Sequence, residues 1–191
     1  MKVKDKSKMV SQVPLKSDIA NKKPVLYLDI DDCILMFPNG TTGHEWLKTY
    51  YETYKYGIGA PGVREFIPWA LKHFEIRWLT MWTMCGRLDS QGNERLEKLT
   101  GVSSDLWEQI INPLSHRYNK IEGIDWKEIE SGRKFIWLED ELLSEEIESI
   151  KNMNVLDSYI RCNVSEDPYA LYKAWHVIKE RFQLPGEINE H

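Results

Sequence analysis

The segment from Pro24 to Leu35 places the strongest constraint on the fold of this chain. An apolar run, Val25 to Leu28, is followed at once by three acidic residues, Asp29, Asp31 and Asp32. A short apolar run rich in β-forming residues predicts a buried strand, and a strand buried on both faces is typical of a parallel sheet. Ligands bind at the carboxyl edge of such a sheet, so we expect these acids to lie where ligands bind.

Two interpretations of these acids are open. The carboxylates of Asp29 and Asp31 would repel each other unless a positive charge lay between them, and Mg²⁺ is the usual hard cation for carboxylate and carbonyl oxygens. An acid after a strand also commonly starts a turn or caps a helix. The choice depends on what the rest of the chain brings to the same edge.

Strand and helix patterns alternate along the remaining sequence. Further strands are expected at Phe74–Leu79, Phe135–Leu138 and Ser158–Cys162, and helices at 44–56, 61–73, 93–99, 106–111, 121–130, 144–150 and 168–182, with 81–87 and 112–118 as loops. This alternation predicts an α/β fold with a mainly parallel sheet.

The bulk properties are those of one globular domain. The chain has 191 residues, of which 42% are hydrophobic and 29% charged, which is ordinary for a single domain with a full core. The first 23 residues hold seven lysines and lack the apolar stretch of a signal peptide. We therefore expect a flexible basic tail at 1–22 and the folded domain at 23–185.

Charge and cysteine content suggest the compartment and partners. Three widely spaced cysteines favour free thiols in a reducing compartment, and no apolar run reaches membrane-spanning length. The expectation is a cytoplasmic protein without a membrane partner. The net charge of −5 argues weakly against general affinity for nucleic acid, although it leaves room for a local basic groove.

Polar residues follow three of the expected strands. Asp29 and Asp31 follow the first, Thr80 the second, and Glu139 and Asp140 the third. Because the carboxyl ends of parallel strands meet at one edge, these side chains are expected to lie together. One acidic turn after a strand is common, whereas three polar strand ends in this order favour a functional site.

A phosphate dianion held against these carboxylates would also need a cation. Lys134 lies at the start of the strand that ends at Glu139, so it is expected at the opposite edge. Lys127 falls within a helix and is expected to face solvent. Lys120, at the junction between a loop and a helix, is the lysine expected to reach the site.

This set of residues resembles the haloacid dehalogenase (HAD) superfamily of aspartate-nucleophile phosphatases. D-I-D-D-C resembles its first motif, D-x-D-x-T/V, and Thr80 in W-L-T resembles the second. Lys120 resembles the third motif, and F-I-W-L-E-D the fourth. The W-L-T-x-W and K-x-x-G-I-D runs look most like the phosphatase-type domain associated with RNA-repair proteins. The resemblance covers about Val25 to Phe182.

The resemblance implies a Mg²⁺-dependent phosphomonoester hydrolase. In such an enzyme Asp29 would attack phosphorus to give an aspartyl-phosphate, and Asp31 would act as general acid and then general base. Mg²⁺ would be held by Asp29, the backbone carbonyl of Asp31, and Asp140. Thr80 and Lys120 would bind the phosphoryl oxygens. A non-catalytic HAD-like binding or regulatory module, and a phosphotransferase using the same aspartate, are the alternatives.

Two positions depart from the family pattern. Cys33 stands where Thr or Val is usual, and as a small hydrophobic residue it should be tolerated. Glu139 stands where the fourth motif usually has its first Asp. We expect Asp140 to be the direct metal ligand, with Glu139 orienting Lys120 or reaching the metal through water.

The family fold implies a three-layer, Rossmann-like sheet with helices on both faces and five parallel strands, the first in the middle. Residues 36–60 are too short for a large cap domain and are expected to form a small flap over the carboxyl edge. Capless members have open sites that accept large substrates, so a nucleotide, a nucleic-acid end or a phosphoprotein is a candidate substrate. The oligomeric state stays open.

A few further residues have alternative roles. Trp82 could stack on a base or pack on the core. Arg87, His116 and Arg117 could contact substrate or lie on the surface, and an aromatic stripe within 44–56 is expected to pack on the domain.

Overall fold

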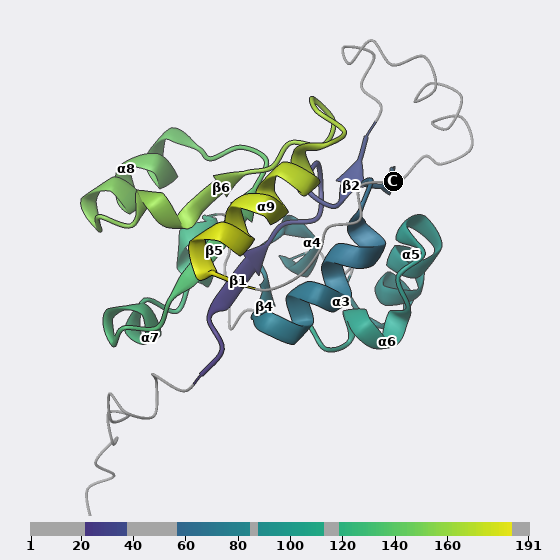
Figure 1. The fold of residues 1–191 in the computed structure, drawn as a ribbon, viewed down its shortest axis with the longest axis horizontal. Helices are drawn as coiled ribbons and strands as arrows, with labels where there is room; N and C mark the ends of the chain where they lie inside the picture. Colours follow the sequence, from purple (N-terminus) through teal and green to yellow (C-terminus); the bar gives the residue numbers. More distant parts are fainter. Residues whose placement is uncertain (1–21, 38–56, 85–87, 113–118, 185–191) are drawn as a thin grey trace, which may run out of the picture.

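The structure is a computed structural model that describes residues 22–37, 57–84, 88–112 and 119–184. Its centre is a parallel sheet of four strands: β1 (Val25–Leu28), β4 (Glu75–Trp78), β5 (Phe135–Glu139) and β6 (Tyr159–Arg161). The spatial order is β4-β1-β5-β6, so the first strand lies between two partners (Figure 1). Every residue of β1 and β5 is buried, as expected for strands covered on both faces.

The described residues form a parallel sheet of four strands, one fewer than the five expected. Ile111 forms a parallel bridge beside β4: its N–H donates to the carbonyl of Ile76 at 3.0 Å, and its carbonyl accepts from the N–H of Trp78 at 2.9 Å. The sequence around Ile111 has no apolar run of strand length, which explains why the sheet extends here by one residue only. The expected helix at 106–111 is also shorter and lies earlier.

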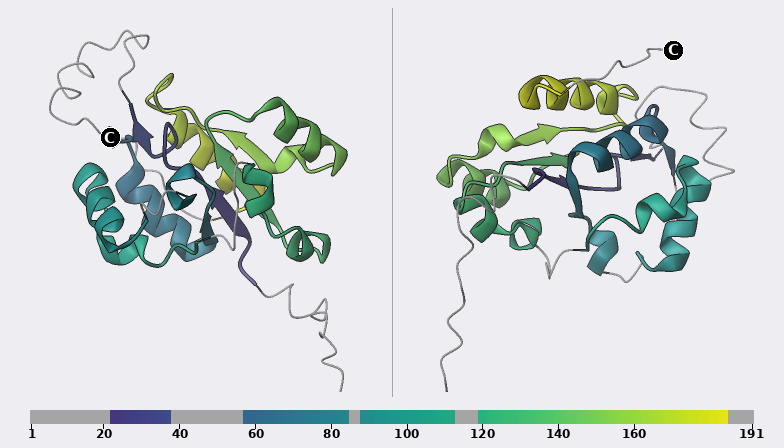
Figure 2. Two further views of the ribbon diagram at one scale, coloured as in Figure 1. Left: turned by 180° about the vertical axis from the view of Figure 1, so that it is seen from behind. Right: turned by 60° about the horizontal axis from the view of Figure 1, so that its bottom comes forward.

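Helices surround this sheet, with these bounds: α3 (Val63–His73), α4 (Met81–Met84), α5 (Ser90–Thr100), α6 (Ser104–Trp107), η1 (Lys120–Gly123), α7 (Trp126–Glu130), α8 (Ser144–Asn152), η2 (Leu156–Ser158) and α9 (Ala170–Phe182). The alternation of side chains along β1 divides them between two cores. Leu26 and Leu28 pack in the core that contains residues of α3, α5 and α9. Val25 and Tyr27 pack in the core that contains residues of η1 and α8. The two views of Figure 2 show α9 lying along one face of the sheet, so the layered α/β arrangement is confirmed.

Two capping residues explain where helices differ from the expected bounds. The side chain of Asp89 accepts a hydrogen bond from the N–H of Gly92 at 2.9 Å, so α5 begins before the expected Asn93. The side chain of Asp125 accepts from the N–H of Glu128 at 3.2 Å. This cap starts a new helix, so the single helix expected at 121–130 is divided into η1 and α7. The loop expected after Thr80 begins instead with the short helix α4.

A small antiparallel hairpin follows the first strand. β2 (Leu35–Met36) pairs with β3 (Ile58–Gly59), and Leu35 forms a bridge with Asp31. The hairpin therefore packs directly against the turn that contains Asp31. Residues 38–56, which include most of the expected flap and the aromatic stripe, lie outside the described residues, as does the expected tail apart from Lys22.

The described residues include no helix with the length and apolar character needed to cross a bilayer.

A network of ion pairs joins the strands at the amino edge of the sheet. Buried Arg133 lies 2.8 Å from Glu75 and 2.7 Å from Glu128, and Arg77 lies 2.6 Å from Glu128. Lys22 adds a contact to Glu128 at 3.2 Å. Burial would raise the pKa of Glu128, but hydrogen bonds from Arg77, Lys22 and Arg133 outweigh it and lower the pKa to about 2.

Replacing Glu128 by Gln should therefore destabilise the fold at neutral pH. Since the pKa of Glu128 falls from 4.5 to about 2 on folding, its stabilisation is present above pH 4.5 and is lost as the pH falls toward 2. The side chain is 22% exposed, so solvent screening reduces the expected loss to about 1–2 kcal/mol. Urea unfolding at pH 7 and pH 3 measures it.

Glu130 provides the matched control for this change. It lies on the same helix, is exposed, and should tolerate Glu130→Gln with little change in stability. A loss in Glu128→Gln that is equally large at both pH values, or equally large in Glu130→Gln, would contradict the prediction.

Candidate active site

The polar strand ends lie together at the carboxyl edge of the sheet. The N–H of Asp29 donates to the carbonyl of Leu138 at 3.2 Å, and the N–H of Leu79 donates to the carbonyl of Leu28 at 2.9 Å. These bonds continue the parallel register past the strands, which places Asp29 between Glu139 on one side and Leu79 on the other, with Thr80 one residue further along. The side chains of Asp29, Glu139 and Thr80 are buried, Asp29 at 3% exposure and Glu139 at 1%.

Lys120 reaches these acids, as the sequence predicts. Its Nζ lies 2.6 and 2.7 Å from the two carboxylate oxygens of Glu139 and 3.3 Å from Oδ2 of Asp29. Lys127 and Lys134 are exposed. Burial would lower the pKa of Lys120, but the charges of Asp29 and Glu139 outweigh it and raise the pKa. The side chain is therefore a fixed cation at this edge.

The contact between Glu139 and Lys120 agrees with one of the roles expected for Glu139, that of orienting the lysine. Burial raises the pKa of the Glu139 carboxyl, the charge of Asp29 adds to this effect, and the Lys120 ammonium opposes it. Both carboxylate oxygens of Glu139 accept hydrogen bonds from Lys120. Asp140, the next residue, is half-buried and lines the cavity at the end of β5.

Three of the acids could hold a metal ion. Asp29, Glu139 and Asp140 each offer one carboxylate oxygen, and these oxygens lie within 4.8 Å of one another. Hard oxygen donors at this spacing fit Mg²⁺. Lys120 contacts both carboxylate oxygens of Glu139 but only Oδ2 of Asp29. The residues that fit best as direct ligands are therefore Asp29 and Asp140.

Glu146 supports the lysine, although no pattern in the sequence assigns it to the site. Its buried carboxylate accepts from the N–H of Lys120 at 3.3 Å and from the N–H of Leu143 at 2.9 Å. Glu146 thus joins the start of η1 to the start of α8. Its place in the first turn of a helix was the available signal, but that signal indicates only a helix start.

Asp31 contacts a residue of α4, the short helix that follows β4. The indole N–H of Trp82 lies 2.9 Å from Oδ1 and 3.0 Å from Oδ2 of Asp31. Trp82 is 5% exposed and packs within the core, so of its two expected roles the structure has the core position. Burial raises the pKa of Asp31 to about 6, the charges of Asp29 and Asp32 add to this, and the hydrogen bond from Trp82 opposes it.

Asp32 has a structural role in the turn that carries Asp31. Its φ is +58°, a left-handed conformation that Asp tolerates better than most residues. The hydroxyl of Ser165 donates to its carboxylate, and the N–H of Val164 donates to its carbonyl at 2.7 Å. Cys33, next along the chain, is fully buried and its thiol donates to the carbonyl of Cys162 at 3.2 Å, as expected of a small core residue.

A cavity of about 450 Å³ opens beside Lys120 and the end of β5, and its lining includes Glu139 but neither Asp29 nor Asp31. Its lining includes Lys120, Asp140 and Glu141, together with the exposed apolar side chains of Met81 and Leu143.

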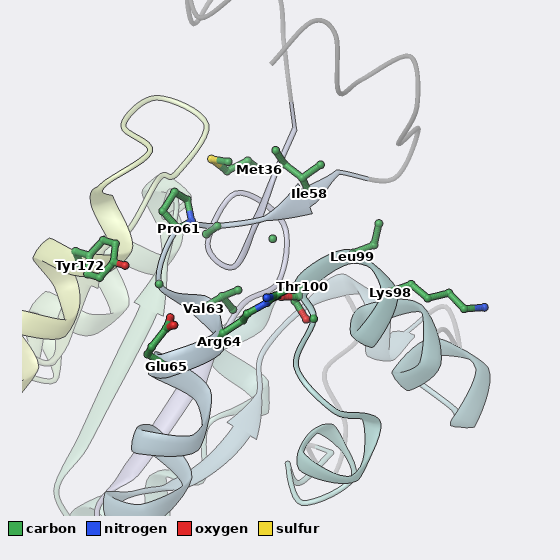
Figure 3. A pocket seen from close by; sticks show the side chains of 14 residues that line it. Met36, Ile58, Pro61, Val63, Arg64, Glu65, Lys98, Leu99, Thr100 and Tyr172 are labelled. Atoms are coloured by element: carbon green, nitrogen blue, oxygen red, sulfur yellow. The ribbon is translucent and has the colours of Figure 1, made fainter. Parts of the chain in front are cut away.

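A second cavity, of about 610 Å³, lies elsewhere, between the β2–β3 hairpin, α3 and α5 (Figure 3). Its lining includes Arg64, Lys98 and Tyr172 but none of the acids at the strand ends. The guanidinium of Arg64 is already held by the carbonyl of Thr100 at 3.0 Å. Arg87, His116 and Arg117, for which substrate contact was one expected role, lie outside the described residues.

Comparison with known proteins adds no relative: no protein-family model, curated protein or solved structure matches this chain.

Proposed function

We propose that this chain is a Mg²⁺-dependent phosphomonoester hydrolase that works through an aspartyl-phosphate on Asp29. The observation that carries the proposal is the contact of Lys120 with both Asp29 and Glu139 at the carboxyl edge, with Asp140 beside them. Buried carboxylates beside Lys120 would repel a bound phosphate. A non-catalytic module that only binds an anion would gain nothing from them, whereas a phosphatase uses them as nucleophile and metal ligands.

In the first step an oxygen of Asp29 attacks phosphorus. The new P–O bond forms as the bond to the leaving alcohol breaks, and Asp31 donates a proton to the departing oxygen. The raised pKa of Asp31, about 6, suits a group that must carry this proton near neutral pH.

In the second step Asp31 takes a proton from water as that water attacks phosphorus. The bond between phosphorus and Asp29 breaks, which releases inorganic phosphate and restores both aspartates. Lys120 and Thr80 bind the phosphoryl oxygens, where negative charge must be stabilised in each transition state. Bound Mg²⁺, held by Asp29 and Asp140, would offset the charge of the carboxylates and the phosphate.

Nucleotides, nucleic-acid ends and phosphoproteins are all candidate substrates for an open site. A screen of phosphorylated metabolites, nucleotides, oligonucleotides with 5′ or 3′ phosphates, and phosphopeptides tests the proposal by phosphate release. We expect release from at least one class with Mg²⁺ and loss of release with a chelator.

Each other outcome of the screen has a definite meaning. An added alcohol that diverts the phosphoryl group into a new ester, without release in its absence, would identify a phosphotransferase. Absence of phosphate release from every class, or release unaffected by the chelator, would overturn the proposed function.

A further inference from the structure

Trp82 contacts two of the residues assigned to the reaction. It lies on α4, two positions after Thr80, and its backbone N–H lies 3.4 Å from the Thr80 hydroxyl. Its indole N–H lies almost equally far, at 2.9 and 3.0 Å, from the two oxygens of Asp31. The ring is 5% exposed and packed in the core, so its indole N–H is held in a fixed position beside the Asp31 carboxylate.

The chemistry of indole suits this contact. The indole N–H donates a hydrogen bond but cannot accept one, so it cannot compete with a leaving group for a proton. A neutral donor placed between the two oxygens fixes the carboxylate and leaves the outer lone pair of each oxygen available.

We propose that Trp82 is a positioning residue, which holds the carboxylate of Asp31 in the orientation that delivers its proton to the leaving oxygen. This inference rests on the proposed function and adds a specific task for a residue that would otherwise only fill the core. Within the described residues, Trp82 provides the side-chain hydrogen bond to Asp31, so its removal frees the carboxylate to rotate.

The test compares Trp82→Phe with wild type on two kinds of phosphate monoester. An alkyl phosphate has a poor leaving group that needs a proton, whereas 4-nitrophenyl phosphate needs little protonation. Trp82→Phe should lower kcat/KM about 10-fold or more on the alkyl ester and less than about 2-fold on the aryl ester. In an Asp31→Asn background, Trp82→Phe should add no further loss that depends on the leaving group.

Trp107→Phe is the matched control. Trp107 is 1% exposed, and its indole N–H donates to the carbonyl of Val102 at 3.1 Å, away from the acids. The same change there should affect both substrates equally. If Trp82→Phe does not fold, 3-benzothienylalanine at position 82 removes the N–H while keeping the shape of the ring.

Equal losses on the two esters, or additive losses in the Asp31→Asn background, would overturn the positioning role while leaving the phosphatase proposal intact. A wild-type protein that hydrolyses neither ester and no member of the wider screen would overturn both. The two failures are therefore distinguishable.

Discussion

Replacing Asp29 by Asn should lower phosphatase turnover by about 10³-fold or more, because the amide keeps the size of the side chain but lacks the attacking charge. The fold should survive. Asp29 is buried near Glu139 with Lys120 between them, so removing one negative charge relieves repulsion between the acids. Thermal unfolding should show a midpoint equal to or above that of wild type, measured without Mg²⁺.

Asp32→Asn is the matched control for this loss. Asp32 lies three positions along the chain, and Asn also tolerates its positive φ of 58° and can accept from Ser165. We expect it to keep most of the wild-type turnover. Equal losses in the two variants, or full turnover in Asp29→Asn, would show that Asp29 has no special role.

Lys120→Met should lower both activity and stability. The change keeps an apolar stem of similar length but removes the cation that lies 2.6 Å from Glu139 and 3.3 Å from Asp29. We expect about 10²–10³-fold lower kcat/KM, the range seen when a group that stabilises transition-state charge is removed. The unpaired buried acids should cost about 2–4 kcal/mol, less than a fully buried pair because Glu139 can take up a proton.

The double variant Lys120→Met/Glu139→Gln separates these two effects. Gln removes the charge that Lys120 no longer balances, so stability to urea should return toward the wild-type value while activity stays low. If the double variant regains activity along with stability, Lys120 is a structural residue rather than a ligand for phosphate.

The sequence predicted the sheet and the polar residues at its carboxyl edge because both depend on local patterns. Apolar runs that end in polar residues at Asp29, Thr80 and Glu139 locate strand ends, and parallel strands bring those ends together. Lys120 could be chosen over Lys134 because a strand fixes which end of the sheet a residue occupies. The count of five parallel strands came from the family resemblance rather than from a residue pattern, and the described residues form four, with a single bridge at Ile111 beside β4.

The supporting contacts could not be predicted in the same way. Trp82 and Asp31 are 51 residues apart, and Lys120 and Glu146 are 26 apart. Such contacts depend on how side chains of different elements meet, which periodicity does not describe. A tryptophan after a strand and a glutamate in a first helical turn both have ordinary structural explanations. Only the three-dimensional structure places Trp82 and Glu146 beside the site.

The most direct test of the account is to trap the phosphoryl group on the chain. Rapid acid quench during turnover, followed by peptide mass spectrometry, should find an acyl phosphate on Asp29 in wild type. The same adduct should accumulate in Asp31→Asn, which lacks the base that activates water, and be absent from Asp29→Asn. Phosphate release by a wild-type enzyme that never carries the label on Asp29, or that carries it on another residue, would contradict the account.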